Sequence, residues 1–140
     1  SPEGAGSPDG AGGAPCEVAI VSPADGEVVP MEEIPDQVFS RGTMGRCMGV
    51  LPSNGNVHAP CKGVVTMVAE TRHAFSIRTD TGANVLVHVG IDTVSLNGKG
   101  FECLVGQGDA VEADDLVMRV DLDAVAAAGL SPVIVVAVME

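Results

Sequence analysis

Glycine and proline interrupt this chain so often that they limit which elements it can form. The sequence contains 18 glycines and nine prolines in 140 residues, spread along its length. Short apolar runs lie between them, and the run at residues 85–91 places every second valine on one face of an extended strand. This spacing is typical of proteins built from many short strands joined by tight turns. We therefore expect an all-β sandwich or barrel and not a helical bundle.

The expected strands include residues 17–21 and 27–29 around the turn at residues 23–26, and a longer strand at residues 63–69. In that longer strand, simple alternation places Val65, Met67 and Ala69 on one face. Two short helical segments are expected as well. Residues 36–39 suit a single helical turn, and the alanine-rich residues 121–128 suit a short helix that Gly129 ends.

The length predicts one domain with a real core, which we assign to residues 16–140. Residues 1–15 consist mainly of Gly, Ala, Pro and Ser, and they have too little apolar surface to offset the entropy lost on ordering. We interpret them as a flexible linker, which favours a piece of a longer polypeptide. Residues 124–139 carry no charge, but Gly129 and Pro132 interrupt them and they are too short for a membrane-spanning helix.

The net charge of −12 excludes several kinds of partner. Nucleic acid would be repelled, and so would an anionic membrane surface, so we expect neither nucleic-acid binding nor direct membrane insertion. A basic protein partner would be attracted and steered towards the chain.

The four cysteines show no spacing that is typical of a metal site or a redox pair. No signal peptide precedes them, so we expect reduced thiols and a cytoplasmic location. The cysteines are Cys16, Cys47, Cys61 and Cys103.

One imidazole stands on the less apolar face of the strand at residues 85–91. His88 shares that face with Leu86 and Gly90, and glycine adds no side chain that would cover the ring. A second histidine, His73, lies one hairpin upstream. Alternation places His73 on the apolar face with Phe75, which by itself favours a structural histidine, although its position at the start of a strand could free it from that pattern.

Several ordered motifs between residues 20 and 138 resemble one family. The run Gly82-x-x-Val-Leu-Val-His88-Val-Gly90-Ile-x-Thr93-Val94 is similar to the phosphohistidine signature of the glucose-type enzyme IIA of the bacterial sugar phosphotransferase system. Other segments that resemble this family are residues 23–29, 34–39, 58–63, 70–75 and 96–101.

The resemblance implies an antiparallel β-sandwich that acts as a phosphotransferase component in the cytoplasm. Such a domain accepts a phosphoryl group from the phosphocarrier HPr on a histidine and passes it to a cysteine of a IIB domain during sugar uptake. It stands alone or forms the cytoplasmic part of a membrane-bound permease. By the same resemblance, the family domain continues about two dozen residues past the strand that ends near Val138. We therefore expect the closing strands of the domain to be truncated here. The alternative is an exposed sheet edge that a partner covers or that is swapped between copies.

The resemblance also assigns roles to individual residues. His88 is the phosphate acceptor through Nε2, with its Nδ1–H bonded to the carbonyl of Gly90. His73 stabilises the charge of the transferred phosphoryl group, and Thr71 is its supporting partner. No cofactor is required, although zinc bound adventitiously or induced by a partner at His73 and His88 is compatible with two imidazoles. His58 has no expected role.

The same resemblance predicts a docking surface around the histidines. Asp36 and Asp92 are expected at its rim, where they would repel the phosphate and pair with basic groups on a partner. Val38, Phe39 and Leu86 are expected as its exposed apolar residues.

Two alternatives come from other classes of protein. A lipoyl- or biotinyl-like carrier is suggested by residues 108–116, but such a carrier displays a lysine at a hairpin tip, and neither Lys62 nor Lys99 stands in such a motif. A metal-binding β domain or zinc hydrolase would use His73, His88 and Asp92, without any recognised ligand spacing. Uptake of one phosphate from a phosphodonor would distinguish the enzyme IIA hypothesis from both. The sequence does not indicate which sugar is transported.

Overall fold

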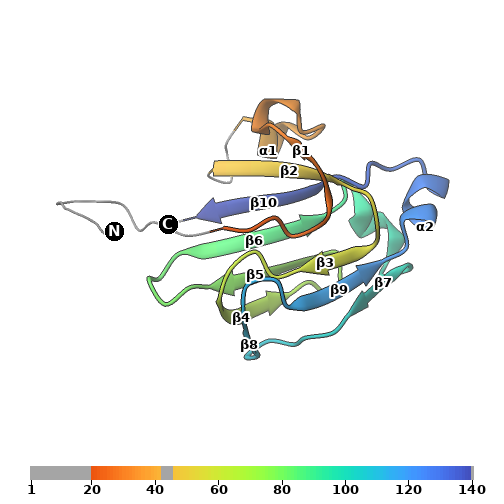
Figure 1. Cartoon of the computed structure of the whole chain (residues 1–140). Coiled ribbons are helices and arrows are strands. Elements are labelled where there is room, and N and C mark those ends of the chain that lie inside the picture. The colour runs from red at the N-terminus through yellow and green to blue at the C-terminus, as the bar shows by residue number, and fades with distance from the viewer. Residues whose placement is uncertain (1–19, 42–45, 140) are drawn as a thin grey trace.

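A computed structural model of the chain describes residues 20–41 and 46–139 (Figure 1). Its strands form two sheets, and every strand pairing in the described part is antiparallel. The larger sheet has the order β1 (Gly26–Val29), β2 (Arg46–Pro52), β10 (Ile134–Met139), β6 (Asn84–Val89), β5 (Ala74–Arg78), β4 (Gly63–Val68) and β8 (Ala110–Val111). The smaller sheet has the order β3 (Asn56–His58), β9 (Leu116–Val120) and β7 (Phe101–Cys103). The predicted all-β fold is confirmed.

Four short helical segments connect the strands in the described ranges. They are η1 (Met31–Glu33), α1 (Gln37–Ser40), η2 (Thr93–Leu96) and α2 (Leu122–Ala127). The predicted helix before Gly129 is α2, and the Asp121 carboxylate caps it by accepting hydrogen bonds from the backbone N–H groups of Asp123 and Ala124. The helical turn predicted near residue 36 is α1.

The main core lies between the two sheets. Figure 1 shows β3 and β9 in front of β5 and β6, and one apolar cluster joins inward side chains of both sheets. Phe75 and Ile77 of β5 meet Val57 of β3 and Met118 of β9 in this cluster, and all four side chains are buried. Because Trp and Tyr are absent, the core consists mainly of valines, which suit extended strands.

The opposite face of the larger sheet carries two smaller apolar clusters. One joins Phe39 of α1 to Ile34, Ile91, Val133 and Val135. The other joins Leu86 of β6 to Ala74 of β5 and Ala137 of β10. The candidate functional residues lie on this second face, so the sheet separates the site from the main core.

Two sequence expectations about strands need correction. Val65 is buried but Met67 is 38% exposed, because the register between β4 and β5 shifts between these residues. An irregularity of this kind re-aims the following side chain, so the predicted common face is wrong. Ile20 and Val21 are not in a strand, although the N–H of Val21 donates to the carbonyl of Pro60 at 2.8 Å. Residues 17–19 and the predicted linker at residues 1–15 lie outside the described residues.

Candidate functional site

His88 lies on β6 between β5 and β10, directly opposite Ala74 and Val135. Its Nδ1 lies 2.7 Å from the carbonyl oxygen of Gly90. Because a carbonyl can only accept, Nδ1 must carry the proton in this bond. The free lone pair of the neutral ring is therefore on Nε2.

Gly90 makes this contact possible through its backbone conformation. Its φ of +80° lies in the left-handed region, which glycine adopts without steric cost. A Cβ at this position would lie 2.3 Å from the side chain of Thr93, which is closer than real side chains approach. Any other residue would have to shift the turn, and the carbonyl that holds the His88 ring would move with it.

His73 lies immediately before β5, and its ring reaches the ring of His88. The two ring centroids are 4.9 Å apart and the planes are nearly perpendicular, at 79°. β5 begins only at Ala74, so the alternating pattern of that strand does not extend back to His73. The apolar-face assignment from alternation is wrong for this reason, and the placement expected from the resemblance is the one observed.

Thr71 holds the ring of His73. The Thr71 hydroxyl lies 2.6 Å from His73 Nδ1, and this contact is compatible with the hydroxyl as donor or as acceptor. When the hydroxyl donates, Nδ1 is the bare nitrogen and the proton of the neutral ring is on Nε2. This arrangement gives the two histidines complementary roles, because one ring then offers a lone pair and the other offers an N–H.

Burial lowers the pKa of both histidines. For His73, burial is the larger cause and the neighbouring His88 lowers the pKa further. For His88, burial outweighs three opposing causes, which are the Gly90 carbonyl and the carboxylates of Asp36 and Asp92. Both rings therefore favour the neutral form at neutral pH, which a nucleophilic imidazole requires.

Two residues predicted to be exposed around the histidines are instead buried. Phe39 is only 6% exposed and its ring packs against His88, with centroids 5.3 Å apart. Leu86 is only 9% exposed, because Ala74 and Ala137 on the neighbouring strands flank it. Both lie near the histidines as expected, but as packing residues and not as exposed docking residues. The side chain of Val38 in α1 lies outside the described residues.

The two predicted carboxylates do surround the site. Asp36 precedes α1 and Asp92 precedes η2, and both are close enough to His88 to affect its pKa. Val94, two residues past Asp92, is 53% exposed and was not singled out from the sequence. Periodicity could not reveal it because Val94 lies in the short helix η2, and only its place in the signature could have drawn attention to it.

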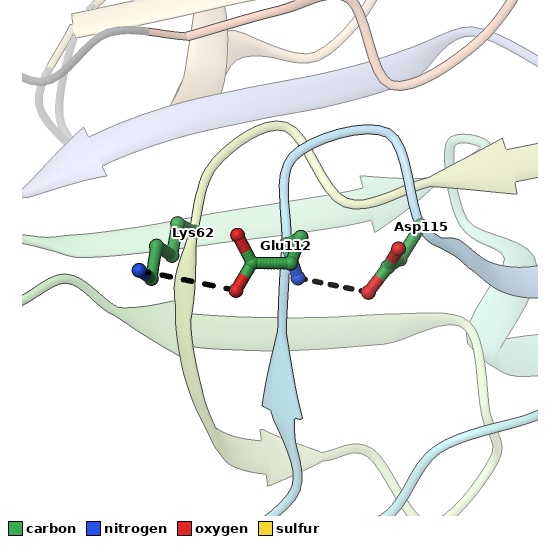
Figure 2. Close-up of polar contacts among 3 residues, drawn as sticks. All are labelled: Lys62, Glu112 and Asp115. Atoms are coloured by element: carbon green, nitrogen blue, oxygen red, sulfur yellow. Dashed lines mark hydrogen bonds and ion pairs between the residues drawn. The ribbon is translucent and has the colours of Figure 1, made fainter.

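The alternative functions gain no support from the arrangement of their residues. Lys62 lies between β3 and β4, which belong to different sheets, so it is not at the tip of a hairpin. Figure 2 shows its ammonium turned towards Glu112, at 3.9 Å, while the N–H of Glu112 donates to Asp115. In the described part of the chain no three His, Cys, Asp or Glu side chains are grouped as a metal site, and no helix there is long and apolar enough to cross a membrane.

Comparison with known families gives the context for the histidine pair. Residues 18–140 match the family described as phosphoenolpyruvate-dependent sugar phosphotransferase system, EIIA 1. The chain belongs to this EIIA 1 family. The resemblance noted in the sequence is thereby confirmed, and the chain is a phosphotransferase component of the EIIA kind.

Relatives and a solved structure agree with this membership. The glucose-specific EIIA component of Oceanobacillus iheyensis is 39% identical over 124 residues, which cover 86% of this chain and 75% of that protein. The glucose-specific EIICBA component of Staphylococcus saprophyticus is 43% identical over 111 residues, but the match spans 79% of this chain and only 16% of that protein. The glucose permease IIA from Mycoplasma capricolum has the same fold, with a TM-score of 0.78, 37% identity and coverage of 86% of this chain and 77% of that chain.

Proposed function

We propose that this EIIA domain carries a phosphoryl group on Nε2 of His88, accepting it from HPr and passing it to a cysteine of a IIB domain during sugar uptake. The observation that carries the proposal is the contact between two imidazoles held by separate hydrogen bonds, His88 by the Gly90 carbonyl and His73 by the Thr71 hydroxyl. Membership of the EIIA 1 family supports the same reaction.

His88 supplies the nucleophile. The Nε2 lone pair attacks the phosphorus of phosphorylated HPr, the new N–P bond forms, and the bond between phosphorus and the HPr imidazole breaks with its electron pair returning to that ring. The Nδ1–H of His88 stays bonded to Gly90 throughout, which stabilises the positive charge that develops on the ring. In the second transfer, a IIB thiolate attacks the phosphorus and the N–P bond to His88 breaks.

His73 stabilises the group in transit. With Thr71 donating to Nδ1, the Nε2–H of His73 is available to a phosphoryl oxygen beside the neighbouring ring. Because the donor is held in place before the reaction, little reorganisation is needed as charge develops. The carboxylates of Asp36 and Asp92 act in the opposite sense, since they repel a bound phosphate and favour its onward transfer.

The exposed surroundings of the site suit brief contacts with two partners. Asp36 and Asp92 attract basic groups, and the exposed Val94 gives apolar contact beside Asp92. Two relatives are named EIICBA components, which supports a partnership with a IIB domain in the cytoplasm. No cofactor takes part in this proposal, and zinc at His73 and His88 would be adventitious or partner-induced.

The test compares three matched histidine variants. His88→Gln should take up no phosphate from HPr, whereas His73→Gln should be phosphorylated but transfer to IIB more slowly, on the order of a hundredfold or more. His58→Gln is the control, because His58 lies on β3 in the other sheet, where its Nδ1 is 3.1 Å from the carbonyl of Asp114. The adduct should be acid-labile and alkali-stable, as a phosphoramidate is. Full labelling of His88→Gln would refute the acceptor assignment, and undiminished transfer by His73→Gln would leave His73 a structural role.

A further inference from the structure

The turn that follows β6 contains a buried hydroxyl that the proposed chemistry does not use. Thr93 is fully buried, and its hydroxyl donates to the carbonyl of Val89 at 2.6 Å. This bond closes the segment from Val89 to Thr93, which contains both Gly90 and Asp92. A buried threonine that bonds the main chain next to the phosphate acceptor is a candidate for positioning that acceptor.

The peptide groups of this turn connect both histidines. The N–H of Val89 donates to the carbonyl of His73 at 2.7 Å, and the carbonyl of Val89 accepts from Thr93. The next carbonyl along the chain, that of Gly90, accepts from His88. Val89 joins the peptide group that bonds to His73 to the one that bonds to Thr93, and Gly90 joins the latter to the peptide whose carbonyl holds His88. A change in the backbone torsions of Val89 and Gly90 would therefore disturb the contacts of both histidines.

Thr93 also restricts the turn through its methyl group. An ideal Cβ built on Gly90 would lie 2.3 Å from Thr93 Cγ2 and 3.3 Å from Thr93 Oγ1, so the side chain lies close against the glycine backbone. On the other side, the N–H groups of Gly90 and Ile91 donate to the carbonyls of Val133 and Ser131, both at 2.9 Å. These backbone bonds hold the N–H side of the turn, and Thr93 holds the Val89 carbonyl.

We propose that Thr93 is a positioning residue for phosphoryl transfer, whose hydroxyl fixes the Val89–Gly90 backbone so that the Gly90 carbonyl keeps His88 in the Nδ1–H form and holds it against His73. The effect on transfer rate rests on the function proposed above. The effect on the His88 tautomer does not, because the tautomer is a property of the unphosphorylated domain.

The experiment replaces the hydroxyl and keeps the shape. Thr93→Val removes the donor to Val89, and Thr93→Ser retains the hydroxyl without the methyl group. The control is Thr79→Val, because Thr79 is another buried threonine, placed in the turn between β5 and β6, where its hydroxyl bonds to Ala83. Thr79 lies at the opposite end of these strands from the histidines. Removing its hydroxyl therefore tests only the effect of general destabilisation.

The first measurement is the tautomer of His88 in the folded protein, from the ¹⁵N shifts and long-range ¹H–¹⁵N correlations of the ring at neutral pH. We expect Nδ1–H to dominate in the wild type, in Thr93→Ser and in Thr79→Val, and a mixture of tautomers in Thr93→Val. The second measurement is the rate of phosphorylation by HPr, which should fall ten- to hundredfold, as an order of magnitude, in Thr93→Val alone.

The possible outcomes separate this inference from the proposed function. If Thr93→Val keeps the wild-type tautomer, or if Thr79→Val loses it to the same extent, Thr93 does not position His88 and the inference is wrong. If Thr93→Val does not fold, the Thr93→Ser variant decides: it should keep the Nδ1–H form and a near wild-type rate, and a mixed tautomer there would overturn the inference. If even the wild type is not phosphorylated by HPr, the proposed function fails, while the tautomer comparison still judges the role of Thr93.

Discussion

Replacing Leu86 tests whether the strand that carries His88 is held by packing on its outer face. The sequence predicted an exposed docking residue here, but the structure places Leu86 between Ala74 and Ala137, with only 9% of its surface exposed. Leu86→Ala should therefore reduce the free energy of unfolding. Leu86→Glu should reduce it further, because a carboxylate would be buried without a partner.

The magnitude follows from the surroundings of the side chain. Buried Leu→Ala changes cost about 2–5 kcal/mol, and the cost grows with the cavity that is left. The neighbours of Leu86 are small residues on the sheet face, and some of the nearby side chains, such as Met139, are only partly buried. We therefore expect a value near the lower end, about 2–3 kcal/mol, and a decrease in Tm of about 6–12 °C for a domain of this size.

The assay is urea unfolding followed by far-UV circular dichroism, since the chain has no Trp or Tyr to report by fluorescence. Leu51→Ala is the matched control, because Leu51 is a leucine of the same sheet, in β2, but is 42% exposed. It should cost about 1 kcal/mol or less. Equal costs for the two alanine variants would refute the packing argument. A folded Leu86→Glu protein that has lost only HPr binding would restore the docking role predicted from the sequence.

Three further predictions concern the chemistry of the site. Burial lowers the pKa of His73 and His88, so the unfolded chain binds more protons than the folded chain at mildly acidic pH. The free energy of unfolding should therefore decrease as pH falls below the ordinary histidine pKa of about 6.5. Between about pH 7.5 and about pH 5.5, the urea midpoint should drop less in His73→Gln than in the wild type. Gly90→Ala should cost at least about 2 kcal/mol and slow phosphorylation, because of the left-handed backbone and the contact with Thr93; wild-type stability in the same unfolding assay would contradict this. Asp92→Lys should slow association with HPr more than it speeds dissociation, and it should weaken the salt dependence of the association rate. Both rates can be measured by stopped flow. An unchanged association rate would show that Asp92 is not part of the docking rim.

The fold class followed from the sequence because turn residues and alternation are local signals. The strand of His88 was identified by its pattern, and the helix α2 by its alanine-rich composition and the following Gly129. Alternation failed where the backbone leaves the regular strand. The register shift after Val65 changes which side chain faces outward, and β5 begins one residue after His73, so its alternation does not include that histidine. The residue types at these positions indicate neither change.

Burial on the outer face was the least predictable feature. Leu86 looks exposed when its own strand is considered alone, since it shares a face with a histidine and a glycine. It is buried in a cluster with Ala74 of β5 and Ala137 of β10, which lie 12 and 51 residues away from it in the sequence. Alternation shows which side chains share a face, and only the strand order shows whether that face is covered.

The chemistry of the histidine pair depends on two kinds of information in the sequence. Each ring is held by a contact two residues away, Thr71 with His73 and His88 with Gly90, so each ring is oriented locally, and for His88 the carbonyl partner also fixes the proton on Nδ1. The contact between the rings depends instead on the register of β5 and β6, which pairs Ala74 with His88. A shift of this register by one residue would leave the Gly90 contact possible but would turn His88 towards the main core. In the proposed mechanism, the local contacts orient the nucleophile and the donor, and the register of the sheet brings both to the same phosphoryl group.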